Sequence, residues 1–564
     1  MMSTTVKKNP LRLAMMAAAV LALAAQSFAA LPEIRITTAN NANPDQGSGG
    51  GGMWGGTTSY KYVKISEFKL TDPNNGNNDV TRSSKPDSIR VRGNSTAGLD
   101  KKPYRIKFGE KIKLFGDTAA KSWVLLANYY DGTFALNAIA FELGKRLGVE
   151  FTNKYWFVDV YINNQYKGLY QLTEQVQSHK GRVDLKEKHR GWLVEMDYHD
   201  PANDERNQWF KSAKYDMGTF IKWPQLDDTS FTKNPNNTSQ LDFVKTDFNN
   251  LVNKMSEGGF PTNGYRDMID LESWAKYVLI QLFMDNFDFN SKAQTGFLLG
   301  SNYCYRIDSS RTSRIKAGPL WDFDLAAGLA RTAPMGGGGG GWGMPGMGGG
   351  GQSSFPAHYQ TYQDSIAPTH AFYRRLWDDP AFKAKYYKTW LKHKNDFQAM
   401  SQLIDQIKSQ VEGSVQGKGA NKWANNQMMG SANLTTQQFN TEVQNLKTWW
   451  NNRLNWVDQR LRSYNIDTTK DVIQSAPPGP GGSTSIASNQ AKYGKGLSVV
   501  KNGLKINATS SASIKVFSLT GDIVRRQTLA SGSHTVSLGN LPRGMYLVRV
   551  NLDGVKQNVK MAVR

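Results

Sequence analysis

The sequence is poor in residues that cross-link a chain or bind zinc. Among its 564 residues it has one cysteine, Cys304, so no intramolecular disulfide can form. Its seven histidines form neither an HExxH motif nor another paired spacing of zinc ligands, and no GxSxG nucleophile turn is present. Zinc-hydrolase and serine-hydrolase activities therefore have little support. The fold must be stabilised by its apolar core rather than by disulfides.

Long apolar runs are missing too, except for one near the N-terminus. Basic residues precede the apolar run 13–25, and Ser27-Phe28-Ala29 supplies the small residues of a cleavage site. This order predicts a signal peptide over residues 1–29, because the alternative, a membrane anchor, needs about 20 apolar residues. We therefore expect an exported protein, extracellular or on the outer cell surface, with no transmembrane span in the mature chain.

Acidic residues are scarce relative to basic ones. The chain has 47 Asp and Glu against 69 Lys and Arg, a net charge of +22. This balance favours anionic partners. A nucleic-acid partner is not expected, because the sequence has neither an arginine-rich recognition helix nor zinc-finger spacing. The length predicts two or three folded units.

Apolar periodicity predicts the organisation of these units. A mixed α and β domain over 31–466 carries Gly-rich insertions near 46–56 and 335–351, a Pro/Gly/Ser linker covers 467–490, and the alternating segment 491–564 predicts a small all-β sandwich. The expected helices are 127–148, 271–287, 371–393 and 438–462. The expected strands of the first domain are 34–38, 60–70, 88–92, 123–126, 157–162, 167–172, 193–197, 296–300 and 320–325.

Two acidic clusters, Asp285/Asp288 and Asp322/Asp324, lie in apolar and aromatic surroundings. A carboxylate in such surroundings is usually paired, protonated or bound to a metal. Acids at a helix end and on a neighbouring strand can converge on a divalent cation and a polyphosphate. Two alternatives remain open here: a salt-bridge network with Lys292, Arg314 or Lys316, and a glycosidase with paired carboxylates.

A basic turn, Arg92 to Phe108, is the second candidate feature. Its Gly93-Asn94-Ser95 turn is rich in hydrogen-bond donors, and lysines including Lys102 follow it. It is either a solvated hairpin or a turn that contacts phosphates with an accompanying lysine. Further along, Glu174 follows a predicted hairpin as the start of a helix, and Glu195 and Asp197 share one face of a strand.

Several motifs together resemble the spore-coat protein H (CotH) kinase-like family, over roughly residues 88–464. The resemblance implies an α+β fold with a divergent protein-kinase-like domain. It also implies an atypical kinase that uses ATP with Mg²⁺ or Mn²⁺ to phosphorylate Ser of a protein acceptor. The motifs, in chain order, are RGNSTAGLDKKPYRIKF, WVLLANYYDGTFALNAIAFELGKRLG, VDVYINNQYKGLYQLTEQV, GWLVEMD, the Asp288 segment, GPLWDFDLAAG and LKTWWNNRLNWVDQRL.

The same resemblance implies roles for individual residues. Asp288 corresponds to the catalytic acid and Asp322 to the metal-binding acid, with Asp324 as its companion. Lys102 and Glu174 correspond to the nucleotide-binding lysine and its acidic partner. The nucleotide-binding turn comprises Arg92, Asn94 and Ser95.

One position departs from the family pattern. The family often has Asn five residues after the catalytic acid, whereas this chain has Ala293. Either Gln294 or Asn290 replaces that metal ligand, or metal binding is weakened, or the protein is inactive. Asp285 is expected only to support the site.

The C-terminal segment resembles the sorting domains of the type IX (Por) secretion pathway. The residues that carry this likeness are IKVFSLTGDIV, LPRGMYLVRV and the final strand. The secretion machinery is then a partner, although the pattern also suits another β-sandwich appendage. The alternative function is a catalytically inactive surface adhesin or scaffold that binds protein or glycan ligands.

Overall fold

The computed structural model describes two compact units, residues 1–479 and 480–564. Each unit is treated by itself below. The described residues are 30–47, 60–93, 95–186, 189–197, 208–215, 217–224, 237–290, 299–327, 367–417, 421–424, 431–472, 474, 497–500, 503–518, 523–542, 544–553 and 555–563. The predicted signal peptide and most of both Gly-rich insertions lie outside these residues.

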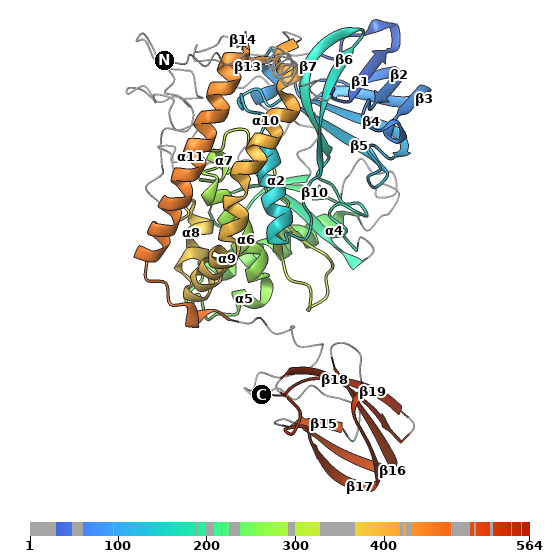
Figure 1. Ribbon diagram of the computed structural model, residues 1–564, viewed down its shortest axis with the longest axis vertical. Coiled ribbons are helices and arrows are strands. Elements are labelled where there is room, and N and C mark those ends of the chain that lie inside the picture. Colours follow the sequence, from blue (N-terminus) through green and yellow to red (C-terminus); the bar gives the residue numbers. More distant parts are fainter. Residues whose placement is uncertain are drawn as a thin grey trace, which may run out of the picture. The chain divides into compact units, whose positions relative to one another are not determined.

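The first unit begins with a closed barrel of seven strands (Figure 1). Neighbouring strands follow the order β1-β2-β3-β4-β5-β7-β6, and β1 closes the barrel by pairing in parallel with β6. The strands are β1 (Glu33–Thr38), β2 (Val63–Thr71), β3 (Val80–Val91), β4 (Tyr104–Ile112), β5 (Ala120–Leu126), β6 (Tyr155–Ile162) and β7 (Gln165–Glu174).

The barrel interior follows from the two-residue period of its strands, because alternate side chains point to the same face. In β4, for example, Tyr104, Ile106 and Phe108 are buried while Lys107 is exposed. These side chains join one apolar cluster with residues from the other six strands. Burial of this cluster stabilises the barrel without any disulfide.

The rest of the first unit combines a second sheet with helices (Figure 1). The sheet has the order β12-β11-β8-β10-β9. Its strands are β8 (Trp192–Met196), β9 (Trp209–Lys211), β10 (Gly218–Trp223), β11 (Asn302–Arg306) and β12 (Lys316–Ala317), and a separate hairpin pairs β13 (Lys422–Ala424) with β14 (Ser431–Asn433). The helices are α2 (Leu136–Leu147), α4 (Asn237–Ser256), α5 (Tyr265–Met268), α6 (Leu271–Phe283), α7 (Phe287–Asn290), α8 (Ala371–Asp378), α9 (Pro380–Gln398), α10 (Met400–Gly417) and α11 (Thr436–Ser463).

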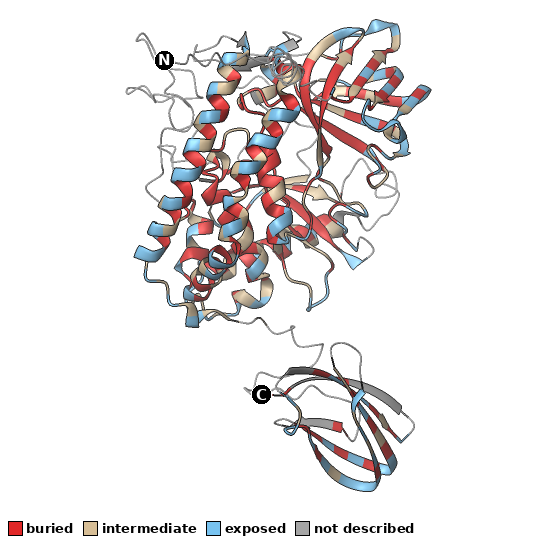
Figure 2. Cartoon of the chain, in the orientation of Figure 1, coloured by how far each residue is buried: buried red, intermediate tan, exposed pale blue. Residues whose placement is uncertain are grey.

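Helix α11 shows how the sequence specifies a helix here. Thr435 and Gln438 form a capping box at its start, which satisfies backbone donors that have no partner inside the helix. The predicted core stripe is confirmed, since Leu446, Trp450, Arg453, Val457 and Leu461 are all buried. Figure 2 shows the same alternation of buried and exposed faces along α11 and α10. Among the helices in the described ranges, none has the length and apolarity to cross a bilayer.

Three local predictions are wrong. The helix expected from residue 127 begins only at Leu136, because Asn128 and Phe134 have positive φ angles of 48° and 59°. Glu174 does not start a helix but ends strand β7. Residues 320–325 are not a strand either, since the only strand residues in this part of the chain are Lys316 and Ala317.

The second unit is all β, as predicted. Its five strands belong to one hydrogen-bonded sheet in which β16 pairs with β15, β17 and β18. The strands are β15 (Leu497–Val500), β16 (Gly503–Phe517), β17 (Ile523–Ser537), β18 (Gly544–Leu552) and β19 (Val555–Val563). A register shift between Ala508 and Ser511 lets the long strand β16 serve different neighbours along its length.

The packed part of the first unit extends beyond residue 466, where the linker was expected to follow. Asp471 forms ion pairs with Lys385 and Lys388, at 2.8 and 3.1 Å. The Gln474 side chain accepts a hydrogen bond from the Leu271 amide at the start of α6. The beginning of the expected linker is therefore part of the first unit.

Candidate functional site

The turn between α6 and α7 brings Asp288 to the site. Helix α6 starts at Asp270, whose side chain accepts a hydrogen bond from the Ser273 amide. It ends before Asp285, which adopts a left-handed backbone (φ 51°) and is 2% exposed. The chain then reverses into the short helix α7, which carries Asp288. The supporting role expected for Asp285 remains a prediction.

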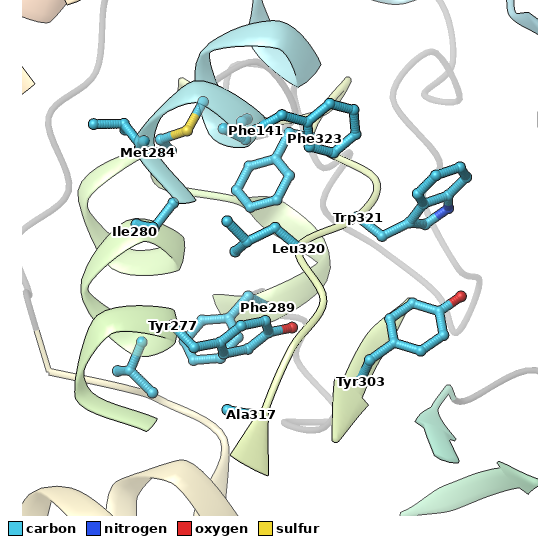
Figure 3. Packing of buried hydrophobic residues seen from close by; sticks show 14 of the residues in the cluster. Phe141, Tyr277, Ile280, Met284, Phe289, Tyr303, Ala317, Leu320, Trp321 and Phe323 are labelled. Carbon is cyan, nitrogen blue, oxygen red and sulfur yellow. The ribbon is translucent and has the colours of Figure 1, made fainter. Parts of the chain in front are cut away.

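Asp322 lies on an irregular segment that the apolar core holds on both sides. Figure 3 shows Leu320 directed toward α6, while Trp321 points away from α6 and its ring centre lies 6.4 Å from that of Phe141 on α2. The Phe323 amide donates to Asn137 Oδ1 at 2.9 Å. Asp322 itself has φ 64°, a backbone that non-glycine residues rarely adopt. Such a conformation persists only where neighbouring contacts enforce it, which is common at functional sites.

A glycine lets the Asp288 turn approach the second sheet closely. The Gly300 amide donates to the Asp288 carbonyl at 2.9 Å. A Cβ atom at position 300 would lie 3.3 Å from both Cβ and Cγ of Asp288. Asn302 reinforces the contact, because its Nδ2 donates to the carbonyls of Asp288 and Gly300. The position of the Asp288 carboxylate thus depends on a small residue at 300.

Ser301 links two carboxylates of the site. Its Oγ donates to Asp322 Oδ2 at 3.0 Å, and its amide donates to Asp197 Oδ2 at 3.3 Å. Asn286 Nδ2 donates a third hydrogen bond, to the Asp322 carbonyl at 3.2 Å. Asp322 is thus held by Asn286, just before α7, and by Ser301, just before β11.

Electrostatics show that the three predicted acids lie together. Burial and the charges of Asp322 and Asp197 raise the pKa of Asp288 well above its usual range. Burial and the charges of Asp322 and Asp288 do the same to the pKa of Asp324. The pKa of Asp322 is also raised by burial, but the charge of Arg92 and hydrogen bonds from neighbouring side chains oppose that rise. Partly buried carboxylates that repel one another favour a nearby cation.

Arg92, at the end of a barrel strand, lies beside these acids. It follows the last residue of β3, and its guanidinium carbon lies 5.2 Å from the centre of the Trp321 ring. Its charge lowers the pKa of Asp322 against the effect of burial. The structure therefore brings together Arg92, Asp288, Asp322 and Asp324. The salt-bridge alternative named Lys316 among its cations, but Lys316 pairs with Glu150.

The structure does not bring Lys102 and Glu174 together, so the predicted ion pair between them is wrong. Lys102 Nζ donates to the carbonyls of Ala97 and Leu99 at 2.9 and 3.0 Å. Glu174 instead accepts from the Lys154 amide at 2.9 Å and lies 3.6 Å from Arg182 Nε.

Strand register explains this separation. Glu174 aligns with Trp123 on β5, and Trp123 aligns with Ile106 on β4. Lys102 lies four residues before Ile106, a displacement of roughly 13 Å along the strand direction. The two residues therefore occupy different levels of the barrel.

Other predicted residues lie outside what the structure describes. Asn94 and Gln294 are not described, as is also true of Ala293, and the side chains of Ser95 and Asn290 are not described either. Whether Asn290 or Gln294 replaces the missing asparagine remains a prediction.

Sequence reasoning missed several residues that lie beside the predicted acids, among them Asp197, Ser301 and Asn286. Asp197 was recognised only as sharing a strand face with Glu195, while Ser301 and Asn286 were not singled out. The position of Asp197 at the end of a strand followed by polar residues was the available signal. No sequence signal indicated Ser301, because its role depends on a left-handed backbone (φ 50°) that only the fold reveals.

The residues present suit a divalent cation that takes some of its coordinating oxygens from the protein and the rest from a bound phosphate. No group of three or more His, Cys, Asp or Glu side chains suited to a metal occurs within the described ranges. Mg²⁺, however, is commonly bound through one or two carboxylates together with substrate phosphates. Asp322 and Asp324 supply two such carboxylates, and burial raises the pKa of both.

Comparison with known protein families matches both units. The profile of the family described as CotH kinase protein matches residues 89–457, about two thirds of the chain. The profile described as secretion system C-terminal sorting domain matches residues 500–564. No curated protein matches the chain. The first match includes all the acids and Arg92 of the site, and the chain therefore belongs to the CotH kinase protein family.

Proposed function

We propose that this exported protein transfers the γ-phosphoryl group of ATP to a serine hydroxyl of a protein acceptor. The observation that carries the proposal is the convergence of Asp288, Asp322 and Asp324 beside Arg92. Phosphoryl transfer needs positioning and charge neutralisation more than covalent participation by the enzyme. Membership of the CotH kinase protein family and the sorting domain match support an exported protein of this kind.

Each residue has a distinct role in this proposal. Asp288 orients the acceptor hydroxyl and takes its proton as the oxygen bonds to the γ-phosphorus. The bond from that phosphorus to the bridging oxygen breaks, and ADP leaves. Arg92 supplies positive charge to the phosphate oxygens. Asp322 and Asp324 hold Mg²⁺ or Mn²⁺, which neutralises phosphate charge when bound.

We also propose that the first unit has a divergent protein-kinase fold. The barrel with Arg92 at one end would contact the nucleotide, as would Lys102, Asn94 and Ser95 in the turn after β3. The Asp288 and Asp322 segments on the helical side would contact the phosphates and the acceptor. The mixed α and β composition and the barrel support this assignment.

The nucleotide site is tested by thermal unfolding of the full chain with ATP and either Mg²⁺ or Mn²⁺. A ligand at 100 times its dissociation constant stabilises the fold by about 2.7 kcal/mol, which gives a clear rise in Tm. Asp322→Asn should abolish the metal-dependent rise. Asp288→Asn should retain it but lose transfer of radiolabelled phosphate to serine.

The exposed Asp267→Asn variant is the control and should behave like the natural protein. If ATP produces no stabilisation with either metal, the proposal is wrong. If Asp288→Asn still transfers phosphate at the normal rate, the assignment of the catalytic acid is wrong.

A binding role without catalysis is the second candidate function, and Ala293 favours it. The family often has a metal-binding asparagine at this position, and alanine has no ligand atom. The protein would then act as a surface adhesin or scaffold for proteins or glycans. This function predicts no phosphate transfer by the natural protein, whereas the first function requires it.

A further inference from the structure

Positive charge is concentrated in the C-terminal unit. Residues 480–564 contain twelve Lys and Arg but only two acids, Asp522 and Asp553. Asp553 is already engaged, since its carboxylate accepts hydrogen bonds from the amides of Thr509 and Ser510. This unit therefore contributes nearly half of the net charge of +22 although it holds less than a sixth of the residues.

Three of these cations form a row across neighbouring strands. Lys515 on β16 pairs directly with Arg526 on β17 and with Arg549 on β18. All three are exposed and aligned with one another, so they share the outer face of the sheet. Like charges directly opposite each other destabilise a sheet. The close spacing of these three like charges points to a negatively charged partner.

An apolar row lies next to the cations on the same face. Phe517 pairs with Ile523 on β17 and with Leu547 on β18, and it is two residues from Lys515. A register shift between Val516 and Phe517 keeps Ile523 in line although it is three residues from Arg526. The two rows are about 7 Å apart along the strands.

The apolar row is unusually accessible. Ile523 and Leu547 are 38% and 39% exposed, and the adjacent Val524 is 42% exposed. These three are most of the five large hydrophobic residues that are exposed within the described parts of the whole chain. The Arg549 guanidinium carbon also lies 5.3 Å from the centre of the Phe517 ring, so the two rows are in contact.

We propose that this face binds the surface of an anionic lipid membrane. The face comprises Lys515, Arg526, Arg549, Phe517, Ile523 and Leu547, and is termed the basic–apolar face. The apolar row lies where β16 ends and β17 begins, and it would enter the boundary between headgroups and acyl chains. The cationic row, about 7 Å further along the strands, would then lie at the level of the lipid phosphates.

The apolar row is the reason to favour a lipid over a soluble polyanion. A soluble polyanion would pair with the cations but would leave the neighbouring apolar side chains in water. An acidic protein segment could satisfy both rows, but the face is a sheet surface whose rows run across three strands, which suits an extended planar partner. This inference does not depend on the proposed phosphotransfer.

The test is cosedimentation of the full chain with vesicles. The probes are vesicles of phosphatidylcholine alone and of phosphatidylcholine mixed with phosphatidylglycerol. We expect binding to the mixed vesicles that weakens with added salt. Changing Lys515→Gln, Arg526→Gln and Arg549→Gln together should weaken it roughly 100-fold, since each cation near an anionic surface contributes about a fivefold factor. Leu547→Ser should weaken it without changing its salt dependence.

A charge-matched control separates this face from general electrostatics. Lys64, Lys69 and Lys121 are exposed in the first unit, and their combined change to Gln removes the same charge. This control should bind nearly as well as the natural chain. Equal losses in both triple variants would overturn the assignment of the face. Absence of binding to mixed vesicles would overturn the proposal, as would binding to poly-glutamate in preference to them, which would assign an acidic protein partner instead.

Discussion

Glu442 illustrates how single buried acids affect this fold. It lies on the buried side of α11 and is 6% exposed. Burial and the charge of Asp131 raise the pKa of Glu442 to about 8. Asp131 is fully buried and accepts a hydrogen bond from the Leu136 amide at the start of α2. The two acids therefore oppose each other between α2 and α11.

The raised pKa of Glu442 predicts a pH-dependent stability. Because the folded state binds this proton more tightly than the unfolded state does, the associated stability is present at low pH. It is lost as pH rises from about 4.5 through about 8. Glu442→Gln stays neutral, so it should be more stable than the natural protein at pH 8, by up to about 4 kcal/mol, and nearly equal at pH 5.

Denaturant unfolding at several pH values measures this difference. The exposed Glu67→Gln variant is the control and should show no pH-dependent gain. A stability difference for Glu442→Gln that does not grow with pH would contradict the assignment.

At the scale of elements, helix α2 and the Asp322 segment pack unusually closely. A Cβ atom at Gly144 would lie 2.7 Å from Leu320 Cδ1 and 2.9 Å from Thr152 Oγ1. Leu320 begins the segment that carries Asp322, and Figure 3 shows it in the centre of the apolar cluster. Position 144 thus controls how near the helix comes to the site.

Gly144→Ala should therefore destabilise the first unit despite the better helix propensity of alanine. The propensity gain is about 1 kcal/mol, whereas overpacking costs about 1–3 kcal/mol. We expect a lower Tm and a smaller stabilisation by ATP and metal, because the Asp322 segment must move. Gly258→Ala is the matched control, since a Cβ atom there meets nothing within 4 Å. Equal behaviour of the two variants would show that the close approach is unimportant.

At the scale of the whole molecule, the end of the first unit determines which fragment is stable. Gln474 Nε2 donates to the carbonyls of Arg266 and Ile269, and its Oε1 accepts from the Leu271 amide. These bonds satisfy backbone groups around the start of α6, which leads to the Asp288 turn. The stretch after 466 therefore supports the site indirectly.

A chain ending at 466 should be less stable than one ending at 479. It loses the Gln474 bonds and the Asp471 ion pairs, and we expect a loss of about 2–4 kcal/mol. Thermal unfolding of both fragments measures the difference, and Gln474→Ala in the longer fragment should reproduce part of it. The same Tm for both fragments would mean that residues 467–479 contribute nothing.

Much of the site was predictable because its residues belong to short motifs. The Asp288 segment and the WDFD sequence combine acids with apolar neighbours, and this contrast is visible without any fold. Arg92 was predictable because it opens a basic turn. The partner of Lys102 was not predictable, because β-strand register sets which residues share a level of the barrel.

By itself, the sequence determined the elements, the family and the identity of the acids. Periodicities of 2 and 3.6 residues are local properties, so most strands and helices follow directly from residue order. Only the tertiary structure decided which groups meet. It joined Arg92 to Asp322 and Ser301 to both Asp197 and Asp322, and it separated Lys102 from Glu174. These outcomes depend on strand register, left-handed turns and close packing, which arise from contacts between residues far apart in the chain.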